Sequence, residues 1–505
     1  MAASPLHRAS RFPSSRRGPG SSMSCRAWLF CCLAFAILCV GYLNLTYLGS
    51  AQATPVAVAP SSPSSISSPS PPSSPSSPSS PSSPSPPSSS SSSSPSSSSP
   101  SSPPSSRDNV HVVFSTDCSP FQSWQSYLVF HSAHAVSQPG RITRIVSGCE
   151  PEEEAALASW HSDHRISPDH HIHFTPRFDQ VDDTGKTYSF FNKPFGVLHW
   201  LENAVGLTAA GGISDEDVMV AIIDPDMVFL APIANDFSSN AVVSKFVVAR
   251  HQATGAAFPA SCTHGNPFGQ QYGLGNGWQK FDLLEITGDP NSPAMGMNAQ
   301  DANAFYPVGP PYIATGRDMY AIVKDWAKFV RPVNAQYPHL LGEMYAYCIA
   351  AAHNRLPHHM LDSLMVSNTD AGGEGWDFVD GRAAACAKDP ALPAPNVLHH
   401  CQMYRVGEFA YHKRMVPKDV FSCSAPLLVE PPETLGEDFL YRTRGKKDGQ
   451  SRPNEDLAPK DAKRNAYMVC NLISAINSAA KFFKDEHCGG DPDASYDKSW
   501  KQSLA

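Results

Sequence analysis

The chain carries little positive charge beyond its first residues. It has 38 Lys and Arg against 46 Asp and Glu, for a formal net charge of −8 at pH 7. No notable basic patch follows residue 26, whereas a nucleic-acid-binding protein gathers Lys and Arg on one face. We therefore expect no nucleic acid among its partners.

Zinc-ligand spacing is absent from the thirteen cysteines, which excludes a cysteine-based zinc site. Four cysteines lie in or beside an apolar segment near the N-terminus, and nine lie in the remainder. If that remainder is in an oxidising compartment, we expect most of the nine to pair. At least one should stay unpaired, because their number is odd.

Acidic residues are absent from residues 1–26, which contain five Arg, and an almost wholly apolar stretch follows at residues 27–48. About 20 apolar residues are enough to cross a bilayer. Because a basic flank stays in the cytosol, we expect a cytosolic stub at residues 1–26 and a type II membrane anchor at residues 27–48. The rest of the chain would then face the lumen or the exterior. A cleaved signal peptide is the alternative.

The apolar residues that a core requires are scarce in residues 49–106, where Ser and Pro dominate. Such a segment has too little apolar surface to offset the entropy of folding, so we expect a disordered, extended stem. Ser/Pro tracts are also substrates for O-glycosylation. A non-catalytic, cell-wall-type Ser/Pro-rich glycoprotein is therefore a rival interpretation.

Residues 107–432 have the composition of a globular domain, and strand-like and helix-like periods alternate along them. Strand-like runs occur at residues 110–115, 142–147, 170–174, 218–223, 246–249, 308–315 and 396–400, and helical spacing at residues 123–136, 152–160, 194–205, 318–330 and 340–353. This alternation predicts an α/β domain with a mostly parallel central sheet flanked by helices. Residues 433–505 are polar, with an amphipathic helix near residues 462–484, and we expect this tail to be peripheral and without chemistry.

Two aspartates, Asp224 and Asp226, end the most apolar of these strands. In an open α/β sheet, ligands bind outside the carboxyl ends of the strands. Two buried like charges at that place need a compensating cation, and Asp-x-Asp can hold Mn²⁺ or Mg²⁺ together with phosphate oxygens. An ordinary Asp-Pro-Asp turn is the alternative.

Histidines 399 and 400 end a late, short strand, and one of them could complete such a metal site. His399 is our candidate for the third metal ligand, and imidazole favours Mn²⁺ over Mg²⁺. The alternative is that one imidazole is exposed and the other is packed, with neither binding a metal.

Four further residues are candidates because they start helices. Asn192 and Lys193 precede a helix, where a Lys can meet a phosphate. Glu343 begins the GEMYAY helix and could face a sugar, although an acid there is also favoured by the helix dipole. Asp318 is a weaker catalytic candidate, since it is also a natural helix-capping residue.

A nucleotide base would be held near the end of the first strand in a sheet of this kind. Ser115, Thr116 and Asp117 lie there, and Trp124 and Gln125 follow on the next helix. We expect these five to line the donor pocket. Their alternatives are ordinary turn residues and core packing.

Six segments within residues 110–432 carry a family resemblance. They are HVVFSTDCSPFQSWQ, RITRIVSG, NKPFGVLHWLENA, AIIDPDMVFLAPI, LLGEMYAYCIAAA and VLHHCQMY. They resemble the plant and green-algal hydroxyproline O-arabinosyltransferases and the related peptidyl-serine α-galactosyltransferases. By position, the resemblance gives Asp224 and Asp226 the role of metal-binding pair, His399 or His400 that of the late His, and Glu343 that of the GEMYAY Glu.

The resemblance implies a GT-A-type fold, a UDP-sugar donor, a divalent cation, and residence in the membrane of the Golgi or ER. It also implies transfer with retention of configuration onto a hydroxyl of a Ser/hydroxyproline-rich acceptor protein. Arabinose to hydroxyproline is the first expectation and galactose to serine the second. Residues 254–305, which should shape part of the donor and acceptor pockets, match only loosely.

Overall fold

The computed structural model describes residues 109–181, 186–206, 217–238, 257–389, 391–407, 409–436 and 459–489, with the backbone of short strands between residues 442 and 456. Every described residue belongs to one compact unit, which lies within Ser98–Ala505. The expected stub, anchor and stem, and the strand expected at residues 246–249, lie outside the described residues. Among the helices that are described, none has the length and apolar character needed to cross a membrane.

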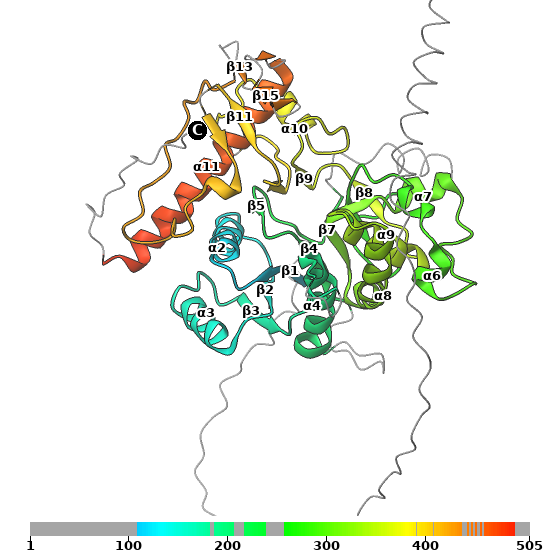
Figure 1. The fold of residues 1–505 in the computed structure, drawn as a ribbon. Coiled ribbons are helices and arrows are strands. Elements are labelled where there is room, and N and C mark those ends of the chain that lie inside the picture. The colour runs from blue at the N-terminus through cyan, green and yellow to red at the C-terminus, as the bar shows by residue number, and fades with distance from the viewer. Residues whose placement is uncertain are drawn as a thin grey trace, which may run out of the picture. The chain divides into compact units, whose positions relative to one another are not determined.

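A seven-stranded mixed sheet forms the centre of the described fold (Figure 1). Its order is β3-β2-β1-β4-β7-β6-β8. The strands are β1 (Val110–Asp117), β2 (Arg141–Ser147), β3 (His170–Thr175), β4 (Met219–Ile223), β6 (Phe268–Gln271), β7 (Val308–Thr315) and β8 (His359–Leu361). Only β7 pairs antiparallel with its neighbours. The predicted α/β class is therefore confirmed, and the sheet is mostly parallel with one reversed strand.

Helices cover both faces of the sheet because the central strands are apolar on both faces. All five residues of β4 are buried. Val113 and Ile222 pack in one core with α4 (Asn192–Trp200), α8 (Gly316–Gln336) and α9 (Gly342–His353). Phe114 and Ile223 face the other way and pack with α2 (Pro120–Ala135). The remaining helices are α3 (Pro151–Asp163), α6 (Leu283–Thr287), α7 (Ala299–Phe305) and α10 (Asp377–Asp380).

A second, three-stranded sheet extends from the carboxyl end of β4. Its order is β5 (Met227–Phe229), β10 (Val397–His399) and β9 (Met365–Val366). Three residues separate the end of β4 from the start of β5, and β5 pairs antiparallel with β10 so that Met227 lies opposite His399. This pairing brings a segment from residue 397 onward beside the Asp-Pro-Asp sequence.

The C-terminal helix α11 (Pro459–His487) belongs to a second core, so its expected peripheral position is wrong. It contacts α2, α10 and the hairpin of β11 (Tyr404–Val406) and β12 (Phe409–Tyr411), as Figure 1 shows for the orange-red helix beside β11. Its apolar face is buried with residues from these elements. The amphipathic pattern correctly predicted the helix, but it carried no information on which elements pack against it. Four two-residue strands precede it: β13 (Arg442–Thr443), β14 (Lys446–Lys447), β15 (Gln450–Ser451) and β16 (Glu455–Asp456).

Three disulfides join Cys118 to Cys149, Cys386 to Cys470 and Cys423 to Cys488. The second attaches α11 to the preceding chain, and the third attaches the residue that follows its last turn. Among the cysteines that the structure describes, three are free: Cys262, Cys348 and Cys401. The expectation that most of the nine would pair is thus confirmed.

Candidate functional site

Asp224 and Asp226 lie between β4 and β5, where the chain passes from one sheet to the other. The amide of Met227 donates to the Asp224 carbonyl at 3.2 Å, which closes the turn. The Asp224 and Asp226 side chains are 17% and 9% exposed. His399 Nε2 lies 3.3 Å from Asp226 Oδ1 and 3.9 Å from Asp224 Oδ2. The three residues predicted as metal ligands therefore come together.

The donor set of this cluster fits a divalent cation. One ligand atom from each of Asp224, Asp226 and His399 lies within 4.8 Å of the other two. Two carboxylates and one imidazole offer oxygen and nitrogen ligands on one side of an ion, which leaves positions for phosphate oxygens or water. The Asp-Pro-Asp turn is present, and it brings both carboxylates to the side of the chain where His399 lies.

The structure distinguishes the two adjacent histidines. His399 Nδ1 lies 3.2 Å from the hydroxyl of Tyr272, so Nε2 is the atom that faces the carboxylates. His400 points elsewhere: its Nδ1 lies 3.0 Å from the hydroxyl of Tyr411, and its ring lies near that of Trp124. Burial lowers the pKa of His400 to about 3, which keeps its imidazole neutral.

Each aspartate also has an ammonium partner. Lys193 Nζ lies 2.7 Å from Asp224 Oδ1 and 3.4 Å from Glu343 on α9. Lys413, in the short helix η4 (Lys413–Met415), pairs with Asp226. No residue pattern near Lys413 indicated a role in the site, because it contacts Asp226 from 187 positions away along the chain.

Burial and charge shift the pKa values of the site in opposite directions. Burial opposes ionisation of Asp226, yet His399 and Lys413 hold its pKa well below the usual value. Burial likewise opposes protonation of His399, but Asp226 and Asp224 raise its pKa. Glu343 is 2% exposed, and burial raises its pKa to about 7 despite the attraction of Lys193. The cavity therefore holds an ionised Asp226 and a Glu343 carboxyl that takes up a proton near neutrality.

A cavity of about 750 Å³ opens onto these groups. That volume is ordinary for a small-molecule site. Ten of the predicted site residues line it: Ser115, Thr116, Asp117, Gln125, Asn192, Lys193, Asp224, Asp226, Glu343 and His399. The register places Phe114 beside Ile223, so the carboxyl ends of β1 and β4 deliver Ser115 and Asp224 to the same edge of the sheet.

Several of these residues also hold the cavity wall together. Thr116 donates its hydroxyl to the Ile145 carbonyl at 3.0 Å and accepts from Arg144 Nε at 2.9 Å. The carboxylate of Asp117 accepts from the amide of Ser119 at 2.8 Å. Only the polar groups of Thr116 and Asp117 that these bonds leave unused can therefore contact a ligand.

Two predicted site residues lie outside the cavity. Trp124 is 2% exposed and packs in the second core. Contrary to our expectation, it does not line the pocket. Asp318 lies in the first turn of α8 and accepts from the amide of Gly265 at 2.7 Å. Because β7 is reversed, its last residue, Thr315, pairs with Met219 at the amino end of β4. Asp318 therefore lies at the opposite edge of the sheet from Asp224, and its proposed catalytic place has no support.

A loop that the sequence reasoning missed closes part of the cavity. Glu374 accepts from the hydroxyl of Ser367 at 2.7 Å and also from the backbone amides of Ser367 and Asn368. Gln270 donates to the Gly373 carbonyl at 2.9 Å, and a Cβ at Gly373 would meet the Gln271 side chain at 2.6 Å. The Gly-Gly pair before Glu374 was the available signal, because it marks a close backbone approach.

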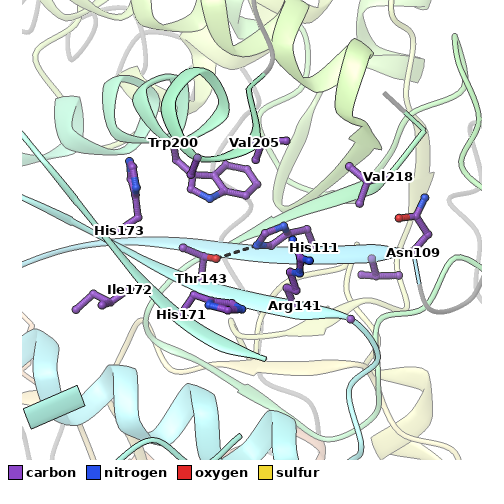
Figure 2. A pocket seen from close by; sticks show the side chains of 13 residues that line it. Asn109, His111, Arg141, Thr143, His171, Ile172, His173, Trp200, Val205 and Val218 are labelled. Atoms are coloured by element: carbon purple, nitrogen blue, oxygen red, sulfur yellow. Dashed lines mark hydrogen bonds between the residues drawn. The ribbon is translucent and has the colours of Figure 1, made fainter. Parts of the chain in front are cut away.

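A second cavity, of about 540 Å³, lies at the amino ends of β1, β2 and β3 (Figure 2). Figure 2 shows His111 bonded to Thr143, at 2.8 Å, with Arg141, His171 and His173 on the neighbouring strands. No carboxylate lines it among the residues described, so it lacks the ligands that a divalent cation prefers. The cavity at the carboxyl ends, by contrast, combines the acids, the imidazole and the ammonium groups.

A peptidyl serine alpha-galactosyltransferase of Arabidopsis thaliana is 22% identical over 327 residues, which cover 64% of this chain and 34% of that protein. One of Chlamydomonas reinhardtii is 25% identical over 425 residues, 76% of this chain and 47% of that protein. The chain is homologous to these plant and green-algal proteins. That relationship confirms the superfamily that the motifs indicated, although the chain spans less than half the length of either relative.

No protein-family model matches the chain. Among solved structures, the apo structure of the WbbM bifunctional glycosyltransferase is similar with a TM-score of 0.31 and 12% identity. The match covers 59% of this chain and 47% of that one. A likeness at that level adds nothing to the site geometry.

Proposed function

We propose that the chain is a glycosyltransferase of GT-A type that needs a divalent cation and takes a UDP-sugar as donor. The observation that carries the proposal is the cluster of Asp224, Asp226 and His399 at the mouth of the large cavity. The homology to peptidyl serine alpha-galactosyltransferases supports it. Mn²⁺ is the preferred ion, because a ligand set with an imidazole suits it better than Mg²⁺.

Different residues of the cavity bind different parts of the donor. A divalent cation on Asp224, Asp226 and His399 supplies positive charge for the diphosphate as it leaves. Ser115, Thr116 and Asp117 face the nucleoside from the end of β1. Lys193 adds an ammonium at the phosphate side.

Glu343 is placed to act on the sugar. Its carboxyl is buried, faces the cavity and lies beside Lys193, so it can hydrogen-bond the sugar or stabilise positive charge at the anomeric carbon. The acceptor hydroxyl attacks that carbon on the face from which UDP departs. Its proton passes to the departing phosphate, so the mechanism requires no strong base.

Galactose transfer to a peptidyl serine is the form of this activity that the named relatives favour. Hydroxyproline arabinosylation, our first expectation from the motifs, is the second candidate. The same motifs occur in both groups of enzymes, and the cavity residues named above discriminate neither sugar nor acceptor. A Ser/hydroxyproline-rich protein is the acceptor in either case.

The three disulfides support residence in an oxidising lumen. We propose that residues 27–48 anchor the protein in the Golgi or ER membrane with type II topology, and that residues 49–106 act as a stem.

One experiment tests activity and specificity together. The full-length protein in detergent is incubated with Mn²⁺, UDP-galactose or UDP-arabinose, and a peptide containing serine or hydroxyproline, and the product is weighed. We expect a mass gain of one sugar that EDTA abolishes and that Asp224→Ala/Asp226→Ala lacks. A folded, metal-loaded protein that transfers no sugar and binds no UDP would instead support the non-catalytic glycoprotein.

A further inference from the structure

The two lysines of the site differ in how firmly they are held. Lys193 lies on α4, is 12% exposed and shares its ammonium between Asp224 and Glu343. Lys413 is 22% exposed and lies in the three-residue helix η4, after the β11–β12 hairpin. Within the part of the chain that the structure describes, Asp226 is the one carboxylate that Lys413 contacts.

Lys413 and a divalent cation need the same carboxylate. Asp226 is one of three residues in the metal-ligand cluster, and its Oδ2 is paired with Lys413 while Oδ1 faces His399. A divalent ion that enters this cluster adds two positive charges beside an ammonium and an imidazole. Such like charges repel strongly in a buried site unless an anion joins them.

The donor supplies that anion. A nucleoside diphosphate carries negative oxygens that can receive both the metal ion and a neighbouring ammonium, and Lys binds phosphate as a compact point charge. The ammonium of Lys413 faces the same cavity as the aspartates and the nucleoside-side residues, so it needs no large movement to leave Asp226 for such an oxygen.

We propose that Lys413 is an exchangeable counter-ion of this site, paired with Asp226 in the free protein and with a phosphate oxygen of the donor once a cation occupies Asp226. This inference rests on the proposed function and deepens it, because it names how donor and metal binding are coupled. The cation alone has to displace Lys413 without giving it a new partner. Cation and nucleotide together satisfy every charge, so each strengthens the binding of the other.

Calorimetric titration of the full-length protein measures this coupling. The affinity for Mn²⁺ is measured with and without UDP, and the affinity for UDP with and without Mn²⁺, in the wild type, Lys413→Met and Arg414→Met. Arg414 is the matched control, because it is the next basic residue on η4, is exposed and does not line the cavity. Its substitution should leave all four affinities unchanged.

We expect Lys413→Met to change the two affinities in opposite directions. Mn²⁺ alone should bind a few-fold more tightly, because its competitor for Asp226 is gone, and UDP in the presence of Mn²⁺ should bind about tenfold more weakly. The factor by which each ligand favours the other should fall accordingly. If Lys413→Met proves too unstable to titrate, Lys413→Gln is measured in its place, with the same expected signs.

Two results would overturn the inference while leaving the proposed function intact. One is wild-type binding of Mn²⁺ and UDP with no response to Lys413→Met. The other is a loss of affinity for both ligands by the same factor, which indicates a purely structural role. A folded wild-type protein that binds neither Mn²⁺ nor UDP would overturn the proposed function itself, and this inference with it.

Discussion

The hydroxyl of Tyr272 lies 3.2 Å from Nδ1 of His399, on the side of the imidazole away from the two aspartates. For Nε2 to offer its lone pair to a cation, Nδ1 has to carry the hydrogen and donate it to Tyr272. The Tyr272 hydroxyl can then donate to Met365 Sδ, 3.5 Å away. Tyr272 thus orients the candidate ligand and can accept the Nδ1 hydrogen of the tautomer that metal binding requires.

Tyr272→Phe should therefore weaken Mn²⁺ binding by about 10- to 100-fold, as loss of such a supporting bond does at other metal sites. Tyr411→Phe is the matched control, because Tyr411 makes the equivalent bond to His400 at 3.0 Å. Both variants lose one phenolic hydroxyl that bonds a histidine, but only Tyr272 contacts the candidate ligand. Calorimetric titration with Mn²⁺ measures the difference, and equal effects would contradict the assignment of His399.

Asp226→Asn should abolish measurable Mn²⁺ binding and lower sugar transfer by roughly a hundredfold or more, because one ligand and its charge are lost. Asp318→Asn is the comparison, since Asp318 is also a buried aspartate, 7% exposed, but lies at the opposite edge of the sheet. It should cost stability through its bond to Gly265 and leave transfer per folded molecule unchanged. Transfer rates of the two variants also test whether Asp318 takes part in the reaction.

The aspartates, His399 and Glu343 could be predicted from the sequence because each lies at or next to the end of a strand or helix that the residue pattern indicated. Two acids at the end of a buried strand repel each other in any α/β fold, and their burial requires compensating charges or hydrogen bonds. Lys413 and Tyr272 could not, because the residues that they contact in the site, Asp226 and His399, lie more than a hundred positions away in the sequence.

Strand direction explains the misplaced residue. Residues 308–315 were correctly predicted as a strand, but periodicity carries no information on whether a strand runs with or against its neighbours. Because β7 is antiparallel to β4, the helix start that follows it lies at the amino edge of the sheet. This reversed direction is why Asp318, which we expected at the active site, instead lies in the first turn of α8 at the other edge of the sheet. Similarly, the period of α11 predicted a helix with one apolar face, but not that α2 and a hairpin cover that face.

Glu343 should make the stability of the metal-free protein depend on pH. Its pKa is raised from 4.5 to about 7 by burial, so the folded chain holds this proton more tightly than the unfolded chain. The stability that the protonated form contributes is complete below about pH 4.5 and is lost as pH rises through about 7. Glu343→Gln should remove this loss. Its advantage over wild type in free energy of unfolding should grow between pH 5 and pH 8, to at most about 3 kcal/mol.

Urea unfolding at a series of pH values in EDTA measures that difference. Glu343→Gln should also lower sugar transfer under conditions where it is the more stable protein, because the amide cannot develop negative charge beside the sugar. A variant that is less stable than wild type at pH 8 would contradict the raised pKa. Equal transfer in the two proteins would remove Glu343 from the mechanism.

The bond between Cys386 and Cys470 should contribute to stability without contributing to chemistry. It closes a separation of 84 residues and attaches α11 to the segment after α10. Cys386→Ala/Cys470→Ala should lower the free energy of unfolding by about 2–5 kcal/mol, since the unfolded chain regains the freedom that the crosslink removed. Cys401→Ser, at a free and exposed cysteine, is the control for thiol loss and should leave it unchanged. Urea unfolding of both variants measures the difference.

Because none of the cavity-lining side chains belongs to α11, the double variant should still bind Mn²⁺ with wild-type affinity while it remains folded. A weaker Mn²⁺ affinity in that state would show that the second core holds the Asp226–Lys413 side of the cavity in place.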